Sequence, residues 1–222
     1  MNSSEEFIKI LEYAGKVTPY IASGLGVVIK LYIVVIICSI PLGLICAIGK
    51  VSKSNIIKGI LEIYTWVFRG TPLLLQLFFV YFGLSKVFGF NQFQAAAVTF
   101  IINYGAYFTE IFRAGIQSID KGQYEAAKAL GMNYSQTMKR IIIPQMLKRV
   151  LPPISNEAIT LVKDTSLVTA IAIGDILRNA KEIASRDFTL TPYIIAGIMY
   201  LALTSVIVYI FKKLEQRYSV YE

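Results

Sequence analysis

Nine polar side chains stand inside, or at the edge of, long apolar stretches of this sequence. A charged side chain in hydrocarbon costs about 3 kcal/mol or more, so its presence there indicates either a polar pathway or a pairing with another group. We predict that the nine residues line a substrate pathway. They are Arg69, Thr71, Gln76, Asn103, Glu110, Asn156, Lys163, Asp164 and Ser166.

The position of Glu110 allows two interpretations. Arg113 follows it by three residues on one expected helix, and opposite charges neutralise each other at that spacing. Asn103 precedes it by seven residues and shares its helix face, as in a polar stripe that lines a cavity. The sequence leaves both the ion pair and the stripe open.

The segment "RGTP" (69–72) interrupts the second apolar stretch. Proline breaks a helix, and glycine permits a close approach of another chain segment. A broken helix inside a bilayer is tolerated only where it is buried in protein or lines water. The segment therefore predicts either a cavity wall at a hinge or an ordinary kink.

The apolar stretches that carry these residues are long enough to cross a membrane. The chain has 222 residues, of which 55% are hydrophobic, and its mean hydropathy is +0.59. About 20 apolar residues span the hydrocarbon core, and five stretches approach this length: 22–48, 60–84, 95–116, 151–174 and 193–211. We predict an all-α membrane protein with five transmembrane helices in one domain (1–222), preceded by an interfacial amphipathic helix (1–20).

Two other classes of function are excluded by composition. The net charge of +8 could suggest nucleic-acid binding, but the basic residues cluster in the gaps between the apolar stretches without interleaved aromatic residues. The chain has no histidine, and its cysteines, Cys38 and Cys46, lie eight residues apart in one apolar stretch. We therefore expect neither a nucleic-acid partner nor a metal site.

The distribution of lysine and arginine predicts the orientation in the membrane. Alternate gaps hold 13 of these residues, whereas the remaining gaps hold six. Cytoplasmic loops carry the excess of positive charge. We expect the N-terminus outside, the C-terminus in the cytoplasm, and the long loop 113–149 in the cytoplasm.

That loop contains "EAAKALGMNYSQTMKRIIIPQ" (125–145), which predicts two short helices. Asp120 with Gln123, and Asn133 with Gln136, have the spacing of a helix-capping box. Gly131 can end the first helix in a left-handed conformation, and the second should reach Pro144. The result is either a structural hairpin on the membrane surface or a docking element with Glu125 as its polar contact.

The same stretch resembles the EAA loop of permease subunits of ATP-binding cassette (ABC) importers. Further stretches resemble the amino-acid branch of this family: "FRGTPLLLQLF" from Phe68, "EIFRAGIQSIDKGQ" from Glu110 and "SNEAITLVKDTSLV" from Ser155. The resemblance covers about Gly24 to Tyr218. The residues that match the EAA pattern are Glu125, Ala126, Ala127, Gly131, Ile141 and Pro144.

The resemblance implies a type I importer permease in the cytoplasmic membrane of a prokaryote. Such subunits form a pore with a second copy or a paralogue, receive an amino acid from an extracytoplasmic binding protein, and dock two cytoplasmic ATPase subunits. Glu125, Ala126, Ala127 and Gly131 would couple this chain to an ATPase. ATP and magnesium would bind that partner, because the nearest phosphate-loop pattern here, "GLICAIGKV" (43–51), has one residue too many between its glycines.

The chain itself is therefore expected to carry no catalytic residue and no cofactor. Polar groups of the stretch 151–174, such as Asn156 and Asp164, could hydrogen-bond an amino-acid zwitterion or could join helices. Glutamine, cystine, glutamate and arginine-type substrates all remain open. The alternative function is a self-sufficient secondary transporter or channel, which needs no docking loop, although no internal repeat supports it.

Overall fold

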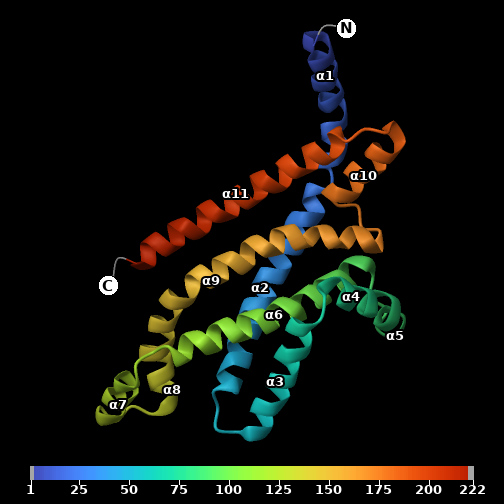
Figure 1. Ribbon diagram of the computed structural model, residues 1–222. Helices are drawn as coiled ribbons and strands as arrows, with labels where there is room; N and C mark the ends of the chain where they lie inside the picture. Colours follow the sequence, from blue (N-terminus) through green and yellow to red (C-terminus); the bar gives the residue numbers. More distant parts are fainter. Residues whose placement is uncertain (1–2, 220–222) are drawn as a thin grey trace.

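The computed structural model describes residues 3–219, and the predictions for residues 1–2 and 220–222 lie outside that range. Within the described residues the chain forms helices joined by short turns, without a strand (Figure 1). The α-helices are α1 (Ser3–Ala22), α2 (Leu25–Lys50), α3 (Asn55–Gly70), α4 (Leu73–Phe78), α5 (Ser85–Phe88), α6 (Gln92–Gln117), α7 (Lys121–Ala129), α8 (Tyr134–Thr137), α9 (Ile143–Asp164), α10 (Ile176–Asp187) and α11 (Thr191–Ser219). The prediction of an all-helical fold is confirmed.

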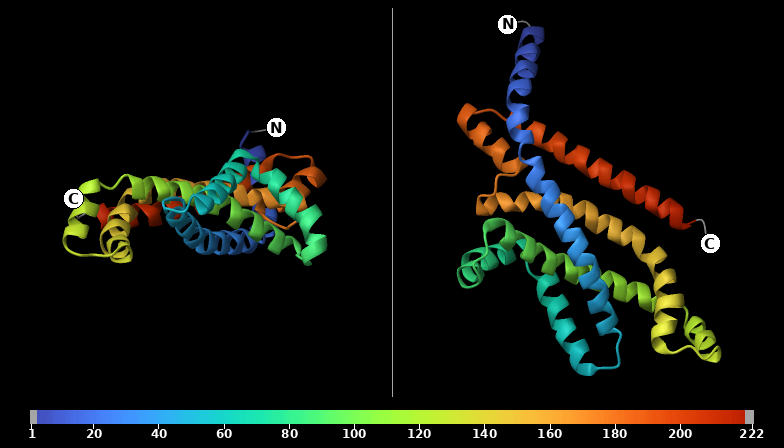
Figure 2. Two further views of the ribbon diagram at one scale, coloured as in Figure 1. Left: turned by 90° about the horizontal axis from the view of Figure 1, so that it is seen from below. Right: turned by 180° about the vertical axis from the view of Figure 1, so that it is seen from behind.

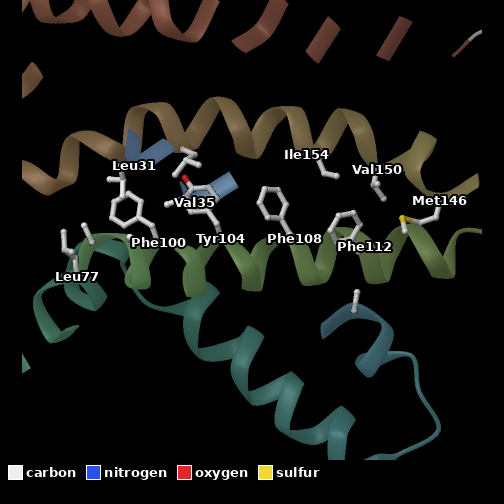
Figure 3. Close-up of a cluster of buried hydrophobic side chains, with 14 of the residues drawn as sticks. Leu31, Val35, Leu77, Phe100, Tyr104, Phe108, Phe112, Met146, Val150 and Ile154 are labelled. Carbon is white, nitrogen blue, oxygen red and sulfur yellow. The ribbon is translucent and has the colours of Figure 1, made fainter. Parts of the chain in front are cut away.

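The main core lies where α6 packs between α2 and α9. Phenylalanines or tyrosine recur at every fourth position of α6, which places them along one helix face. This face meets Leu31 and Val35 of α2 and Val150 of α9 (Figure 3). The buried aromatic residues of α6 are Phe100, Tyr104, Phe108 and Phe112.

Helices α2 and α6 approach each other closely at Gly43. A Cβ atom at this position would lie 2.5 Å from the Cβ atom of Phe108, which is closer than such atoms come in proteins. Glycine is therefore required at this crossing. The close contact fixes α6 against α2. It thereby sets the relative positions of the polar side chains on the two helices.

A second, smaller core lies at the other end of α2, where α1, α10 and α11 meet. Val17 and Ile21 of α1 pack there with Ile176 and Ile183 of α10. The first half of α1 projects from this junction, as Figures 1 and 2 show, and apolar residues such as Phe7 and Leu11 are exposed on it. A helix is present over most of the predicted range, and its amphipathic character and its position at a membrane interface stay predictions.

Three helices, α2, α6 and α11, are long and apolar enough to cross a membrane among the described residues. Helix α3 and the following segment Leu73–Phe88 form a fourth candidate if the two, bent by 104°, are one broken span. The predicted fourth span, 151–174, does not qualify, because α9 begins earlier, carries more charge and ends at Asp164, where a 3₁₀ turn (Thr165–Ile171) follows. The five-span count is therefore not confirmed by length and composition.

Pro144 does not end the second helix of the 113–149 loop. Helix α8 passes through a π-helical turn (Met138–Ile142) directly into α9, which continues to Asp164. Pro144 is the second residue of α9, which begins directly after this π turn. The wider π turn carries the backbone past this position without a break.

Candidate functional site

The predicted break at "RGTP" is present in the structure. The backbone carbonyl groups that the break leaves without helical partners accept hydrogen bonds from side chains. Helix α3 ends at Gly70, and Thr71 and Pro72 are extended. The amide of Gln76 donates to the carbonyl oxygens of Phe68 (3.0 Å) and Thr71 (3.1 Å). Since unpaired backbone carbonyls are costly in a membrane, Gln76 stabilises the break.

Asn103 of α6 joins the same network. Its side chain is buried, and its amide donates to the Phe68 carbonyl (2.8 Å) and to the side-chain oxygen of Gln76 (3.0 Å). The Thr71 hydroxyl accepts from Gln76 at 2.8 Å. The structure thus brings together three of the predicted pathway residues, and their hydrogen bonds hold the broken helix against α6.

A polar pocket of about 460 Å³ lies beside this break. Helix α3, the break, α6 and α9 form its walls, and its volume suits a small ligand. Its charged residues are one arginine, Arg69, and two acids, Glu157 and Asp164. The other polar lining residues are Thr71, Asn103, Tyr104, Tyr107 and Thr160.

Two contacts orient the charged groups of the pocket. The hydroxyl of Tyr104 donates to a carboxylate oxygen of Asp164 at 2.7 Å. The guanidinium of Arg69 lies over the ring of Tyr107, 5.5 Å from its centre, at the range of a cation–π interaction. Arg69 therefore lines the pocket from α3 and the two carboxylates line it from α9, while α6 forms a further wall.

Glu110 lies at the centre of an ion cluster next to the pocket. Its carboxylate contacts Lys50 at 2.5 Å, Arg113 at 2.7 Å and Arg69 at 3.8 Å. Lys50 is buried and also donates to the Thr65 hydroxyl at 2.9 Å. The predicted pair of Glu110 and Arg113 is confirmed, and its extension to Lys50 links the ends of α2 and α6.

Five of the nine predicted pathway residues do not line the pocket. Gln76 and Glu110 lie in the hydrogen-bond network and the ion cluster beside it, whereas Asn156, Lys163 and Ser166 take part in neither. Asn156 and Lys163 are exposed on α9, and the Ser166 hydroxyl donates to the Lys163 carbonyl at 2.7 Å. Their role in transport stays a prediction.

Four polar lining residues were not among the nine predicted candidates: Tyr104, Tyr107, Glu157 and Thr160. Part of the signal was available in the sequence. Glu157, Thr160 and Asp164 have spacings of three and four residues, which place them on one face of a helix. The two tyrosines follow Asn103 by one and four residues on α6, but tyrosines in an apolar stretch look like core residues before the neighbouring helices are known.

The second candidate site is the turn between α7 and α8, which we name the EAA hairpin (121–142). The N–H of Met132 donates to Ala127 O at 3.0 Å and that of Gly131 to Lys128 O at 3.0 Å, the pattern of a Schellman motif. Gly131 has a φ of +72°, as predicted. Asn133 and Gln136 form the predicted capping box in both directions (2.9 and 3.0 Å).

The predicted capping box of Asp120 and Gln123 is only half formed. The Asp120 carboxylate accepts from the N–H of Gly122 at 2.7 Å and caps α7. The Gln123 side chain accepts from Gln145 of α9 at 3.1 Å, and this bond ties α7 to α9. Arg149 of α9 also donates to the hydroxyl of Ser118 at 3.1 Å, so the base of the EAA hairpin is fixed on both sides.

The predicted coupling residues differ in exposure. Glu125 and Ala126 are exposed, and Leu130 beside them is 78% exposed. Ala127 is fully buried within the chain. Burial raises the pKa of the Tyr124 hydroxyl above the ordinary value of a tyrosine. A partner can therefore touch Glu125, Ala126 and Leu130, whereas Ala127 serves the packing of the hairpin.

A helical membrane subunit with a broken helix, a small polar pocket and an exposed helical hairpin has the features of a transport component. Residues 39–220 match the family described as "Binding-protein-dependent transport system inner membrane component". The chain belongs to this family. It is an integral protein of the cell membrane and the permease subunit of an ABC importer, which confirms the family inferred from the EAA motif and does not favour the secondary-transporter alternative.

Three curated relatives extend over most of the chain. The arginine transport system permease protein ArtQ of Bacillus subtilis (strain 168) is 44% identical over 90% of this chain and 92% of its own length. A putative glutamine transport system permease protein GlnP of Rickettsia bellii (strain RML369-C) is 34% identical over 94% and 98%. The L-cystine transport system permease protein TcyB of Bacillus subtilis (strain 168) is 39% identical over 82% and 79%.

Two solved structures share the fold. A crystal structure of an amino acid ABC transporter with histidines contains a chain that is 37% identical, with a TM-score of 0.82 over 95% of this chain and 98% of that chain. A chain of the MetNI methionine ABC transporter in an inward-facing conformation is 16% identical, with a TM-score of 0.69 over 98% and 99%. The second likeness concerns the fold alone.

Proposed function

We propose that this permease subunit carries an amino acid with a cationic side chain, and that the polar pocket binds it on its way across the membrane. The observation that carries the proposal is the charge of the pocket, one arginine facing two carboxylates. An amino-acid zwitterion can place its carboxylate at Arg69 and its ammonium at one acid. The second acid then remains for a positive side chain.

The named relatives support an amino-acid substrate. ArtQ, at 44% identity, is named for arginine, and the structure at 37% identity is an amino acid transporter with histidines. GlnP and TcyB are named for glutamine and cystine. The two carboxylates of the pocket favour a basic substrate over these neutral ones, because a neutral side chain would leave one of them uncompensated.

The test is substrate binding to the permease assembled with its ATPase, without the extracytoplasmic binding protein. Arginine, lysine and histidine should compete with labelled arginine, whereas glutamine, cystine and glutamate should not. Glu157→Gln and Asp164→Asn should weaken arginine binding by roughly 10- to 100-fold, since losing a charged hydrogen bond costs about 1.5–3 kcal/mol. Glu125→Gln, outside the pocket, should leave binding unchanged.

Two results would exclude this assignment. Equal competition by glutamine would show that no cationic side chain is recognised. Unchanged arginine binding in both Glu157→Gln and Asp164→Asn would show that the substrate binds elsewhere, for example near Asn156 or Lys163.

The proposal includes five membrane crossings, with the N-terminus outside and the C-terminus in the cytoplasm. Helices α2, α6 and α11 are three of them, and α3 with the segment Leu73–Phe88 is a fourth. We assign the fifth to α9, whose charged residues include the two acids of the pocket and whose apolar residues, such as Val150 and Ile154, pack in the main core. The excess of basic residues in alternate gaps supports the orientation.

We further propose that the EAA hairpin docks a cytoplasmic ATP-binding subunit through Glu125, Ala126 and Leu130. Gly131 gives the hairpin its defined turn, and buried Ala127 supports it. ATP and magnesium bind the partner, so this chain is not itself an enzyme. A second permease copy or paralogue completes the pore, and an extracytoplasmic binding protein delivers the substrate.

A further inference from the structure

A second pocket, of about 520 Å³, lies at the far end of α6 from the α5–α6 turn. It forms where α2 ends, α3 begins and the EAA hairpin leaves α6. Figure 1 shows the α2–α3 turn and helices α7 and α8 at the same end of the molecule. The pocket therefore touches both the membrane-spanning part and the hairpin.

The walls of this pocket are basic. Lys50, Lys58 and Lys121 line it, and no acidic residue is among its lining residues in the described chain. Lys50 is neutralised by Glu110 at 2.5 Å. Among residues 3–219, neither Lys58 nor Lys121 forms an ion pair. Two uncompensated positive charges from different elements, α3 and α7, thus face one cavity.

A buried hydrogen-bonding group in the same pocket also has no partner. The hydroxyl oxygen of Ser52 is inaccessible to solvent and makes no hydrogen bond within the described residues. Buried hydroxyls are nearly always paired, and because Ser52 lines the pocket, rotation about its Cα–Cβ bond would turn the hydroxyl toward a partner in the cavity. A hydroxyl donor beside two ammonium groups suits the oxygen atoms of a phosphate.

The level of the pocket along α3 indicates where that phosphate comes from. Ile56 and Ile60, in the first turns of α3, are 75% and 62% exposed. Exposed isoleucines at the start of a helix place it against lipid, and Lys58 between them marks the boundary with water. Phospholipid headgroups lie at this boundary, and basic pockets between helices on the cytoplasmic side bind acidic ones.

We propose that the pocket binds the phosphate headgroup of an anionic phospholipid. Lys58 and Lys121 contact the phosphate from either side, and the Ser52 hydroxyl, rotated toward the cavity, donates to it. The lipid thereby ties the start of α3 to the first turn of α7. This bridge stiffens the joint through which motion of the EAA hairpin reaches the membrane-spanning helices.

The experiment measures lipid binding to the permease assembled with its ATPase subunit in a neutral detergent. Short-chain phosphatidylglycerol is titrated, and bound lipid is counted by native mass spectrometry. The double variant Lys58→Gln/Lys121→Gln should bind the lipid about tenfold more weakly or worse, as two basic groups are lost. Lys58→Arg/Lys121→Arg, which keeps both charges, should bind it normally.

A matched control separates the pocket from general surface charge. Lys53 and Lys139 are exposed basic residues outside the pocket, and Lys53→Gln/Lys139→Gln should leave lipid binding unchanged. Equal weakening in both Gln double variants would overturn the proposal.

Two further outcomes point to another occupant. Inorganic phosphate that displaces the lipid at millimolar concentration would assign the pocket to a soluble phosphate. Loss of the ATPase subunit from Lys58→Gln/Lys121→Gln in neutral phosphatidylcholine nanodiscs would assign it to an acidic group of that subunit. Either result would overturn the lipid proposal.

Discussion

The side-chain amide of Asn103 donates two hydrogen bonds at the point where the pocket meets the broken helix. Its buried amide reaches both the Phe68 carbonyl and the side chain of Gln76. Removing it would leave the side-chain oxygen of Gln76 without this donor and the Phe68 carbonyl with only its bond from Gln76. Asn156 lies on the exposed face of α9 and has no comparable duty.

We therefore predict different results when each of these two asparagines is replaced by leucine. Asn103→Leu should lower the stability of the purified complex by about 1–3 kcal/mol, the cost of unpaired buried polar groups, and should reduce uptake. Asn156→Leu, at an exposed position, should change stability by less than about 0.5 kcal/mol. Thermal unfolding and transport into proteoliposomes measure both effects. An uptake defect in Asn156→Leu alone would place the pathway along the exposed face of α9.

Glu110 differs from Asn103 in that its carboxylate neutralises more than one cation. The side chain of Lys50 is only 7% exposed, so the loss of its partner leaves a buried charge. Glu110→Gln should destabilise the protein by about 3–5 kcal/mol. Adding Lys50→Met should recover much of this loss. If the double variant is as unstable as the single one, the pairing with Arg69 and Arg113 dominates.

At the residue scale, the sequence identified the polar groups but not their partners. Glu110 was correctly paired with Arg113, which follows from helical spacing alone. Its shorter contact with Lys50 joins residues 60 positions apart, and no local pattern encodes such a contact. The same holds for Tyr104, which reaches Asp164 across two helices.

Among the elements, the EAA hairpin has a geometry that depends on a single glycine. Gly131 has a φ of +72°, a conformation that β-branched residues avoid. No atom lies within 4 Å of the place where a Cβ atom would stand. Backbone strain alone therefore decides what this position accepts.

Gly131→Val should strain the turn by about 1–3 kcal/mol and should release the ATPase subunit during purification. Gly131→Asn is the matched control, because asparagine adopts the left-handed conformation readily. It should keep both the ATPase subunit and the substrate-stimulated ATP hydrolysis. Co-purification of the ATPase with both variants in equal amounts would contradict a role of this turn in docking.

Local signals predicted helix ends better than helix lengths. The break at Pro72 and the cap at Asn133 follow from residues that act within one turn, and both are present. The helix after Asn133 was predicted to reach Pro144, but it continues through the π turn into α9 and on to Asp164. Helix α10 was not predicted, although Ile176, Ala180 and Ile183 have helical spacing and are buried.

For the whole molecule, orientation in the membrane is the property on which the other proposals depend. The second pocket and the EAA hairpin must face the cytoplasm if one is to meet headgroups of the inner leaflet and the other an ATPase. The distribution of basic residues favours this orientation, and packing alone leaves it open, because a helical bundle can be inserted either way.

Single cysteines in a variant that lacks Cys38 and Cys46 test the orientation. A cysteine at Lys53, in the α2–α3 turn, or at Lys139, in the EAA hairpin, should react with a membrane-impermeant maleimide only after the cells are opened. A cysteine at Lys181, on exposed α10, should react in intact cells. The three sites are exposed within the described chain, so differences in labelling report the side of the membrane. Labelling of Lys53→Cys or Lys139→Cys from outside would invert the topology, and would remove the EAA hairpin from any contact with a cytoplasmic ATPase.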